Sequence, residues 1–133
     1  MLELSRDALD TLVAHCLGAL PLEGCGLLVG DLARGRVVEV VGARNAAASA
    51  LIYELDPSEH LAADRAAEAR GLDVIGVFHS HTHTDAWPSR TDVDAAVDPA
   101  WHWLIVSLRH HAPVVRSFLI RDGHILEEPV VVA

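Results

Sequence analysis

The sequence predicts a single α/β domain in which one mixed β-sheet packs against a small number of helices. Its 133 residues suit one domain, spanning residues 1–133, and leave little room for a second. Hydrophobic residues make up 51% of the chain, which is enough for one buried core. Helical and strand patterns alternate before a closing run of strands, an order typical of a mixed sheet with helices packed on it.

The chain opens with a predicted helix over residues 5–20. Ser5 is a suitable N-cap, and Pro21 stops the helix because proline cannot continue the hydrogen-bond ladder. Apolar residues recur at helical spacing along this segment and form one stripe: Leu9, Leu12, Val13, Cys16, Leu17 and Leu20. We expect the helix to be amphipathic and to bury this stripe.

A hairpin and a loop follow the first helix. Residues 24–30 are predicted to form a buried strand, a turn over 31–35 reverses the chain, and residues 36–41 return as a second strand. Residues 44–49 are predicted to be loop. The short segment 51–55 is predicted to be a further strand.

The second predicted helix has a clear start and a clear end. Asp56 can cap it, Glu59 can reach back to that cap, and Gly71 marks its end. A continuous apolar strand over 74–78 then leads directly into His79. The remaining predicted segments are a loop over 82–88, a short helix over 89–97 that ends before Pro99, and strands over 103–108, 114–121 and 124–132.

Charge and composition exclude several classes of function. The formal net charge is −9 and basic residues do not cluster, so neither nucleic acid nor a membrane surface is an expected partner. No apolar run approaches the length of about eighteen residues that a membrane span requires. Cys16 and Cys25 are too few for a disulfide framework, and the first residues lack the pattern of a secretory signal. We therefore expect a cytoplasmic protein.

A candidate metal site lies in the segment 79–92. His79 and His81 are two residues apart at a strand end, and both imidazoles face the same side because strand side chains alternate. Asp92 follows in the first turn of a predicted helix, and the intervening loop can return its carboxylate to the same point. Two imidazoles and one carboxylate are a normal zinc set and leave a fourth position for water. His83 is the alternative fourth ligand, although closed structural sites favour cysteine.

This pattern resembles the signature of the JAMM (MPN-plus) metalloprotease family. In that signature a Glu on an early strand precedes His-x-His, seven residues, Ser, two residues and Asp; the matching residues here are Glu23, His79, His81, Ser89 and Asp92. The resemblance covers nearly the whole chain. It implies a JAMM/MPN-like fold with a curved mixed sheet flanked by helices. It also implies a zinc-dependent peptidase with one Zn²⁺ per chain.

One bacterial branch of this family is more similar still. Its members carry His-Ser-His-Thr and Pro-Ser-Arg-Thr-Asp, as this chain does at residues 79–82 and 88–92. The branch contains a mycobacterial-type peptidase that releases cysteine from a ubiquitin-like sulfur-carrier protein, so the resemblance implies a carrier of this kind as substrate and partner. Thr82 stands where many family members have Pro, which weakens a match to the eukaryotic deubiquitinating branch.

The resemblance also implies roles for Glu23 and Ser89. Glu23 would accept a proton from the attacking water and hand a proton to the departing amine. Ser89 would donate a hydrogen bond to the developing oxyanion, and its position three residues before Asp92 places both on one side of a helix start. Each residue has a structural alternative. Glu23 could be a surface carboxylate, and Ser89 could be a helix N-cap, a role compatible with the catalytic one.

Other residues near the metal segment are candidates for supporting roles. The groups that orient the imidazoles are expected among Ser80, Asp85 and Thr91. Trp87 is a candidate wall of the substrate groove or else packs the loop. Arg90 is a candidate two-pronged partner for a substrate carboxylate. Three further residues are expected in the core: Cys25, Trp101 and Trp103.

Three functions stay open at this point. The first is an isopeptidase or peptidase acting on the extended C-terminal tail of a ubiquitin-like sulfur carrier, where Arg90 would face the carboxylate of a terminal cysteine. The second is a metallohydrolase with the same site that acts on another small amide substrate or on a carrier precursor. The third is a non-catalytic MPN scaffold, although such scaffolds typically lack the ligands. The sequence does not indicate an oligomeric state.

Overall fold

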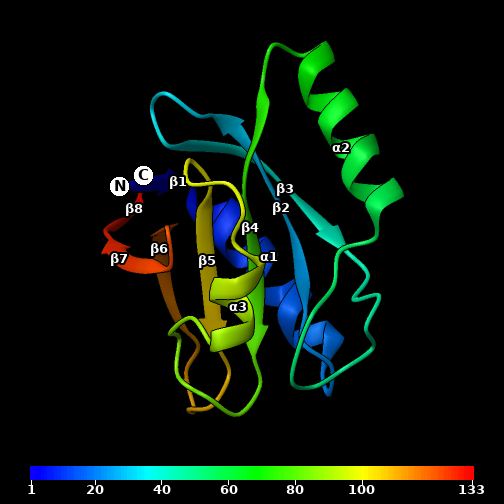
Figure 1. The fold of residues 1–133 in the computed structure, drawn as a ribbon, viewed down its shortest axis with the longest axis vertical. Helices are drawn as coiled ribbons and strands as arrows, with labels where there is room; N and C mark the ends of the chain where they lie inside the picture. The colour runs from blue at the N-terminus through cyan, green and yellow to red at the C-terminus, as the bar shows by residue number, and fades with distance from the viewer.

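The computed structural model describes residues 1–133 and confirms an α/β fold built on one mixed sheet (Figure 1). Eight strands follow one another across the sheet in the order β7-β6-β5-β4-β2-β3-β1-β8. The strands are β1 (Leu2–Leu4), β2 (Cys25–Asp31), β3 (Arg36–Ala43), β4 (Asp73–His81), β5 (His102–Ser107), β6 (Val114–Arg121), β7 (His124–Glu128) and β8 (Val130–Val132). The helices are α1 (Arg6–Ala19), α2 (Pro57–Ala69) and α3 (Arg90–Ala95).

The two ends of the strand order come close together, so the sheet is curved and nearly closed. β7 and β8 lie at opposite ends of the order, yet only Pro129 separates them along the chain. β8 pairs in parallel with β1, and the Leu2 N–H donates to the Pro129 carbonyl oxygen at 2.9 Å. The two termini therefore lie side by side (Figure 1).

Helices α1 and α2 cover opposite faces of β2. Successive side chains of a strand point to opposite faces, and the buried clusters follow this rule. Leu28 packs in one cluster with Cys16 of α1, whereas Leu27 and Val29 pack in another with Ala67 of α2. The sheet thus lies between two helical layers, and the strand that follows Glu23 is buried on both faces.

The backbone of α1 at Cys16 passes close to Gly24, the residue before β2. A Cβ atom on Gly24 would lie 2.8 Å from the Cys16 Cα, so only glycine permits this approach. Leu17 is turned by about 100° from Cys16 around the helix, and it is 48% exposed. The predicted apolar stripe is therefore buried at its centre but not at its C-terminal end, where Leu20 is also exposed.

The strand predicted over residues 51–55 is wrong. The segment forms no strand, and its one ladder contact is an isolated bridge between Asn45 and Leu55. The side chain of Asn45 takes the place of a neighbouring strand, since it donates to the Ile52 carbonyl at 3.0 Å and accepts from the Glu54 N–H at 3.1 Å. Two backbone groups of this segment are therefore satisfied by a side chain rather than by a ladder.

The strand predicted over residues 124–132 is divided in two. Pro129 has no N–H to donate, and the chain on either side of it pairs with a different neighbour, β7 with β6 and β8 with β1. Strand β1 was not predicted at all, because three residues are too few to show a period. The other predicted helices and strands are present with their ends displaced by a few residues.

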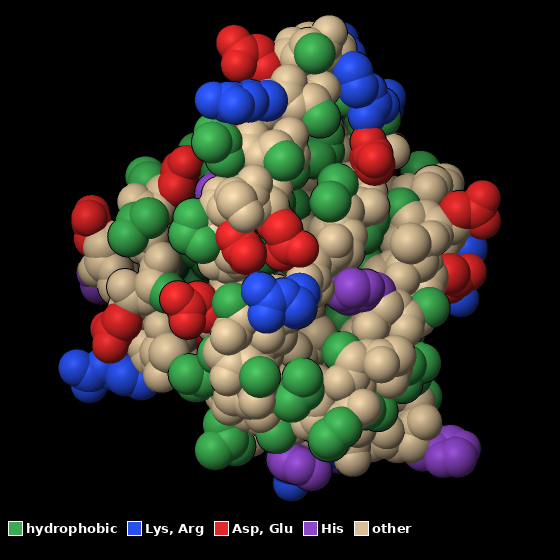
Figure 2. All heavy atoms as spheres, turned by 90° about the vertical axis from the view of Figure 1, so that its right-hand side faces the viewer, with side chains coloured by type: hydrophobic (Ala, Val, Ile, Leu, Met, Phe, Trp, Pro, Cys, Tyr) green, Lys and Arg blue, Asp and Glu red, His purple; other side chains and the backbone are tan.

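The surface agrees with the charge pattern of the sequence. The face seen in Figure 2 carries its Arg side chains among Asp and Glu, without a continuous basic patch. None of the three helices combines the length and apolar character needed to cross a membrane.

Candidate metal centre

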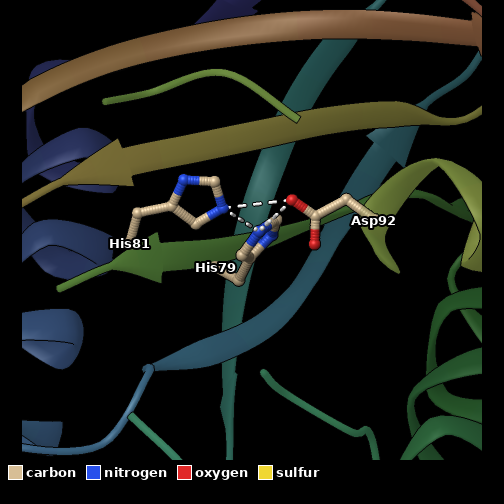
Figure 3. Close-up of side chains that lie close together, drawn as sticks. All are labelled: His79, His81 and Asp92. Carbon is tan, nitrogen blue, oxygen red and sulfur yellow. Dashed lines mark hydrogen bonds and ion pairs between the residues drawn. The ribbon is translucent and has the colours of Figure 1, made fainter. Parts of the chain in front are cut away.

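The structure brings His79, His81 and Asp92 together at one buried point. The two histidines lie at the end of β4, and Asp92 is the third residue of α3 (Figure 3). The Nε2 atoms of His79 and His81 are 3.1 Å apart. The Asp92 Oδ2 lies 3.3 Å from the Nε2 of His79 and 3.0 Å from that of His81. One possible ligand atom from each residue thus faces a common centre.

The spacing of these three atoms fits a small divalent cation. Tetrahedral Zn²⁺ with ligand bonds of about 2.0–2.1 Å separates its ligand atoms by about 3.3–3.4 Å. The observed separations of 3.0–3.3 Å need only a slight expansion. Burial lowers the pKa of His79 and so favours the neutral imidazole, which is the form that binds a metal. Geometry and donor chemistry both suit zinc.

Asp92 is held as a carboxylate by its neighbours. Burial alone would raise its pKa, but the adjacent imidazoles of His79 and His81 outweigh burial and hold the pKa of Asp92 well below its usual range. The start of α3 also fixes its position. The Ser89 N–H donates to the Asp92 Oδ2 at 2.8 Å, and the Asp92 N–H donates to the Ser89 Oγ at 3.1 Å. This reciprocal capping box ties the ligand to Ser89.

The orientation of His81 is set by a backbone carbonyl. Its Nδ1 lies 2.8 Å from the carbonyl oxygen of Asp85, so an Nδ1–H donor leaves the Nε2 lone pair free for a metal. Of the three predicted orienting residues, Asp85 therefore acts through its main chain. Ser80 accepts a hydrogen bond from the Gly24 N–H at 2.8 Å, and Thr91 is exposed. Neither side chain forms a hydrogen bond with an imidazole.

His79 is oriented in a different way, through Tyr53. The Nδ1 of His79 is buried and has no hydrogen-bond partner. The Tyr53 ring stacks on the imidazole, with ring centroids 4.3 Å apart and planes inclined by 23°. Tyr53 was not predicted from the sequence, because no spacing or motif connects the loop that carries it to the metal segment.

Glu23 lies beside this centre and is buried, with only 4% of its surface exposed. It is therefore not a surface carboxylate. Glu23, His81 and Ser89 all line one small cavity of about 120 Å³. Burial raises the pKa of Glu23 to about 7, with smaller opposing effects from His81, which lowers it, and Asp92, which raises it. The structure thus places both predicted catalytic residues at one opening of the metal centre.

A second and larger cavity, of about 380 Å³, lies on the Asp92 side of the centre. Tyr53 and Leu55 line it together with Trp101 and Trp103. Trp103 is buried as predicted, and its indole N–H has no partner, whereas Trp101 is only partly buried. The tryptophans expected in the core therefore also form the wall of this cavity. Cys25 is fully buried, as predicted.

The structure does not bring Trp87 or His83 to the metal ligands. Trp87 packs edge-on against Phe118, with ring centroids 5.1 Å apart, and the Arg116 guanidinium lies 5.4 Å from its ring centroid. It thus packs the loop and lines neither cavity. His83 is exposed at the edge of the small cavity and lies outside the group of converging ligand atoms.

Arg90 follows Ser89 at the start of α3 and projects into solvent. Its side chain is 92% exposed, and its ion pair with Asp94 spans 3.6 Å. An exposed pair of this kind holds the guanidinium only weakly, so the side chain is free to reorient.

Comparison with known proteins gives the same family. Residues 5–121 match the family described as prokaryotic homologs of the JAB domain. The chain belongs to this family, and its resemblance to the JAMM metalloproteases is confirmed. A solution structure of a protein from Desulfitobacterium hafniense superimposes with a TM-score of 0.91 at 35% identity and covers 100% of this chain and 93% of its own. A JAB1/MPN domain protein from Archaeoglobus fulgidus has the same fold, with a TM-score of 0.65 at 22% identity over 98% of this chain and 99% of its own.

Curated relatives carry the names of peptidases and conjugate-cleaving enzymes. The CysO-cysteine peptidase of Mycobacterium tuberculosis is 39% identical over 131 residues, which are 98% of this chain and 90% of that protein. The desampylase of Haloferax volcanii is 38% identical over 80% of each chain. A probable TtuB-protein conjugate cleaving protease of Thermus thermophilus is 33% identical over 92% of this chain and 78% of its own.

Proposed function

We propose that this chain is a zinc-dependent peptidase that hydrolyses the amide bond at the C-terminal tail of a ubiquitin-like sulfur-carrier protein and releases cysteine. The convergence of His79, His81 and Asp92 beside the buried Glu23 carries this proposal. The name of the mycobacterial relative, CysO-cysteine peptidase, supports the substrate class. The absence of a basic patch on the face in Figure 2 agrees with a protein substrate rather than a nucleic acid.

Zinc would be held by the Nε2 atoms of His79 and His81 and by the Oδ2 of Asp92. When bound, Zn²⁺ supplies a Lewis acid that polarises the scissile carbonyl and lowers the pKa of water toward neutrality. The capping box of α3 and the Asp85 carbonyl hold two of the three ligands in place before any ion arrives. Preformed ligands of this kind reduce the ordering that metal binding requires.

Glu23 is the proposed general base and acid. Its carboxylate lines the small cavity beside His81, where it accepts a proton from the attacking water. It then delivers a proton to the amine, which departs poorly as an anion. A pKa raised by burial to about 7 suits both transfers, because the group gains and loses a proton near neutral pH.

Ser89 is the proposed oxyanion donor. Its Oγ already accepts the Asp92 N–H, so the hydroxyl proton remains available to a second partner. Because Ser89 lines the same cavity as Glu23, this proton can reach the oxygen of the carbonyl group whose carbon the water attacks. The N-cap and catalytic roles are thus compatible. Arg90, which follows it and has an exposed guanidinium paired only loosely with Asp94, would contact the carboxylate of the released cysteine.

The proposed function is tested by metal analysis and a hydrolysis assay on the wild type and on His81→Ala. We expect one zinc per wild-type chain, and intact-mass detection of cysteine release from a carrier–cysteine conjugate. Both should be lost in His81→Ala. Zinc without release would redirect the proposal to another small amide substrate or a carrier precursor. A wild-type protein that binds no zinc when prepared without chelators would contradict the enzyme and favour a scaffold.

A further inference from the structure

The segment Asn45–Leu55 connects β3 to α2. It is called the bridging segment here because it contacts both Glu23 and the loop that follows His81. The Glu23 N–H donates to the Ser49 carbonyl oxygen at 2.8 Å. The Thr82 Oγ1, one residue after His81, donates to the Ala50 carbonyl oxygen at 2.9 Å. The segment thus joins the chain at Glu23 to the loop that leaves the metal ligands, although it contains no helix and no strand.

The bridging segment also supplies walls to both cavities. Ala50 and Leu51 line the small cavity that contains Glu23 and Ser89. Tyr53 lines the larger cavity and stacks on His79. Irregular backbone at such a position requires something other than a ladder to hold its shape.

The side chain of Asn45 holds this shape. It is 7% exposed, and its amide nitrogen lies within hydrogen-bond distance of three carbonyl oxygens: Glu23 at 3.0 Å, Ser49 at 3.2 Å and Ile52 at 3.0 Å. Its amide oxygen accepts two backbone N–H groups: Ala47 at 3.0 Å and Glu54 at 3.1 Å. Both ends of one amide are therefore fully used.

We propose that Asn45 is a positioning residue for the hydrolysis, acting by holding Glu23 and the bridging segment against the metal ligands. Asn45 binds the backbone of Glu23 directly, so a shift of its amide moves the base. It also binds the residues on either side of Tyr53, and so fixes the ring that lies on His79. The effect of Asn45 on catalysis rests on the proposed role of Glu23. Its role in holding the bridging segment does not depend on the proposed function.

No other side chain offers the same set of bonds. Aspartate keeps the shape and the acceptor of Asn45 but has no N–H donor for the Glu23 carbonyl. Alanine removes both. The two substitutions therefore separate the donor function from the acceptor function. Asn45→Asp also fills the space of the native side chain, so it can still be tested if Asn45→Ala fails to fold.

The first experiment measures amide hydrogen exchange in Asn45→Ala and Asn45→Asp, with Ser117→Ala as the matched control. Ser117 is also buried and donates to Glu128 at 2.9 Å, but it lies outside both cavities. We expect faster exchange across residues 46–54 in both Asn45 variants. In Asn45→Asp the amides of Ala47 and Glu54 should keep part of their protection. Ser117→Ala should leave this segment unchanged.

The second experiment measures kcat on a carrier–cysteine conjugate with each variant loaded to one zinc per chain. Misplacement of a catalytic group by about 1 Å costs up to about a hundredfold, so we expect kcat to fall roughly tenfold to a hundredfold in both Asn45 variants. Zinc content should stay at the wild-type value, and Ser117→Ala should keep wild-type kcat. A residue that serves only stability would lower the melting temperature and leave kcat unchanged in the zinc-loaded protein.

The outcomes separate this proposal from the proposed function. Unchanged exchange over residues 46–54 overturns the role of Asn45, whatever the activity. Faster exchange with wild-type kcat in the zinc-loaded variants also overturns it. If the wild type hydrolyses no carrier conjugate, the proposed function fails, while the exchange data still decide whether Asn45 holds the segment.

Discussion

The ring of Tyr53 lies flat against the imidazole of His79, with centroids 4.3 Å apart and an inclination of 23°. The His79 Nδ1 has no hydrogen-bond partner. The ring is therefore restrained by its contacts with two neighbouring rings, those of Tyr53 and His81. Tyr53 thus restrains the plane of the His79 ring, whereas the Asp85 carbonyl orients His81 by a hydrogen bond.

Removal of the Tyr53 ring should weaken zinc binding. Aromatic pairs contribute about 0.5–1.5 kcal/mol beyond their buried area, which corresponds to roughly a two- to tenfold loss of zinc affinity in Tyr53→Leu. Competition with a fluorescent chelator measures this loss. Tyr53→Phe keeps the ring and is the control; equal affinity in Tyr53→Leu and the wild type would show that stacking does not matter.

Glu23→Gln should separate metal binding from catalysis. The substitution keeps the shape of a buried side chain and leaves the three ligands intact, so zinc content should not change. Loss of the general base should lower kcat by about 10²- to 10⁴-fold. The assay is cysteine release at saturating conjugate, with elemental analysis of the same samples. A Glu23→Gln protein with near wild-type turnover would remove Glu23 from the mechanism.

Ser89→Ala should lower both stability and turnover. Loss of the N-cap costs about 0.5–2 kcal/mol, and loss of an oxyanion donor costs about 10²- to 10³-fold in kcat. Ser5→Ala provides the control, because the Ser5 Oγ caps α1 by accepting the Ala8 N–H at 3.0 Å. Ser5→Ala should be less stable with unchanged kcat. The same result for Ser89→Ala would leave Ser89 with a capping role alone.

The protein should become less stable in acid, because the buried carboxylate of Glu128 becomes protonated. This carboxylate is buried, and its Oε2 accepts hydrogen bonds from the His102 Nδ1 at 2.6 Å and the Ser117 Oγ at 2.9 Å. Burial alone would raise the pKa of Glu128, but the hydrogen bonds from His102, the terminal ammonium and Ser117 outweigh it and lower the pKa below its ordinary value.

A pKa that is lower in the folded state stabilises the fold above the unfolded pKa of about 4.3, and this contribution is lost as the pH falls through the folded value. Thermal melts from about pH 7 down to about pH 3 should therefore show a steeper loss for the wild type than for Glu128→Gln. At neutral pH, Glu128→Gln should be less stable by about 2 kcal/mol. Glu68→Gln, at an exposed position of α2, is the control. Identical slopes for the wild type and Glu128→Gln would contradict this assignment.

The regular parts of the site could be predicted from the sequence, and the irregular parts could not. His79 and His81 follow from the two-residue period of a strand, and Asp92 from a helix start, because local geometry decides both. Glu23 came from resemblance alone. Asn45 and Tyr53 could not be predicted, because their contacts depend on the irregular shape of the bridging segment. The side chain of Asn45 maintains that shape, and such hydrogen bonds leave no periodic pattern in the sequence. The alternation of Leu51, Tyr53 and Leu55 is typical of a strand, and the strand that it predicted is absent.

Strand β4 lies inside the sheet between β2 and β5, so His79 projects from backbone that is paired on both sides and His81 from backbone that is paired with β5. Asp92 comes instead from the six-residue helix α3, which lies outside the sheet, begins with its own cap and packs on the core through Val93. The metal centre thus takes two ligands from the sheet and the third from a short helix outside it. We expect an ion to enter and leave by displacement of α3, with the histidines stationary, so metal exchange should be faster than any opening of the sheet.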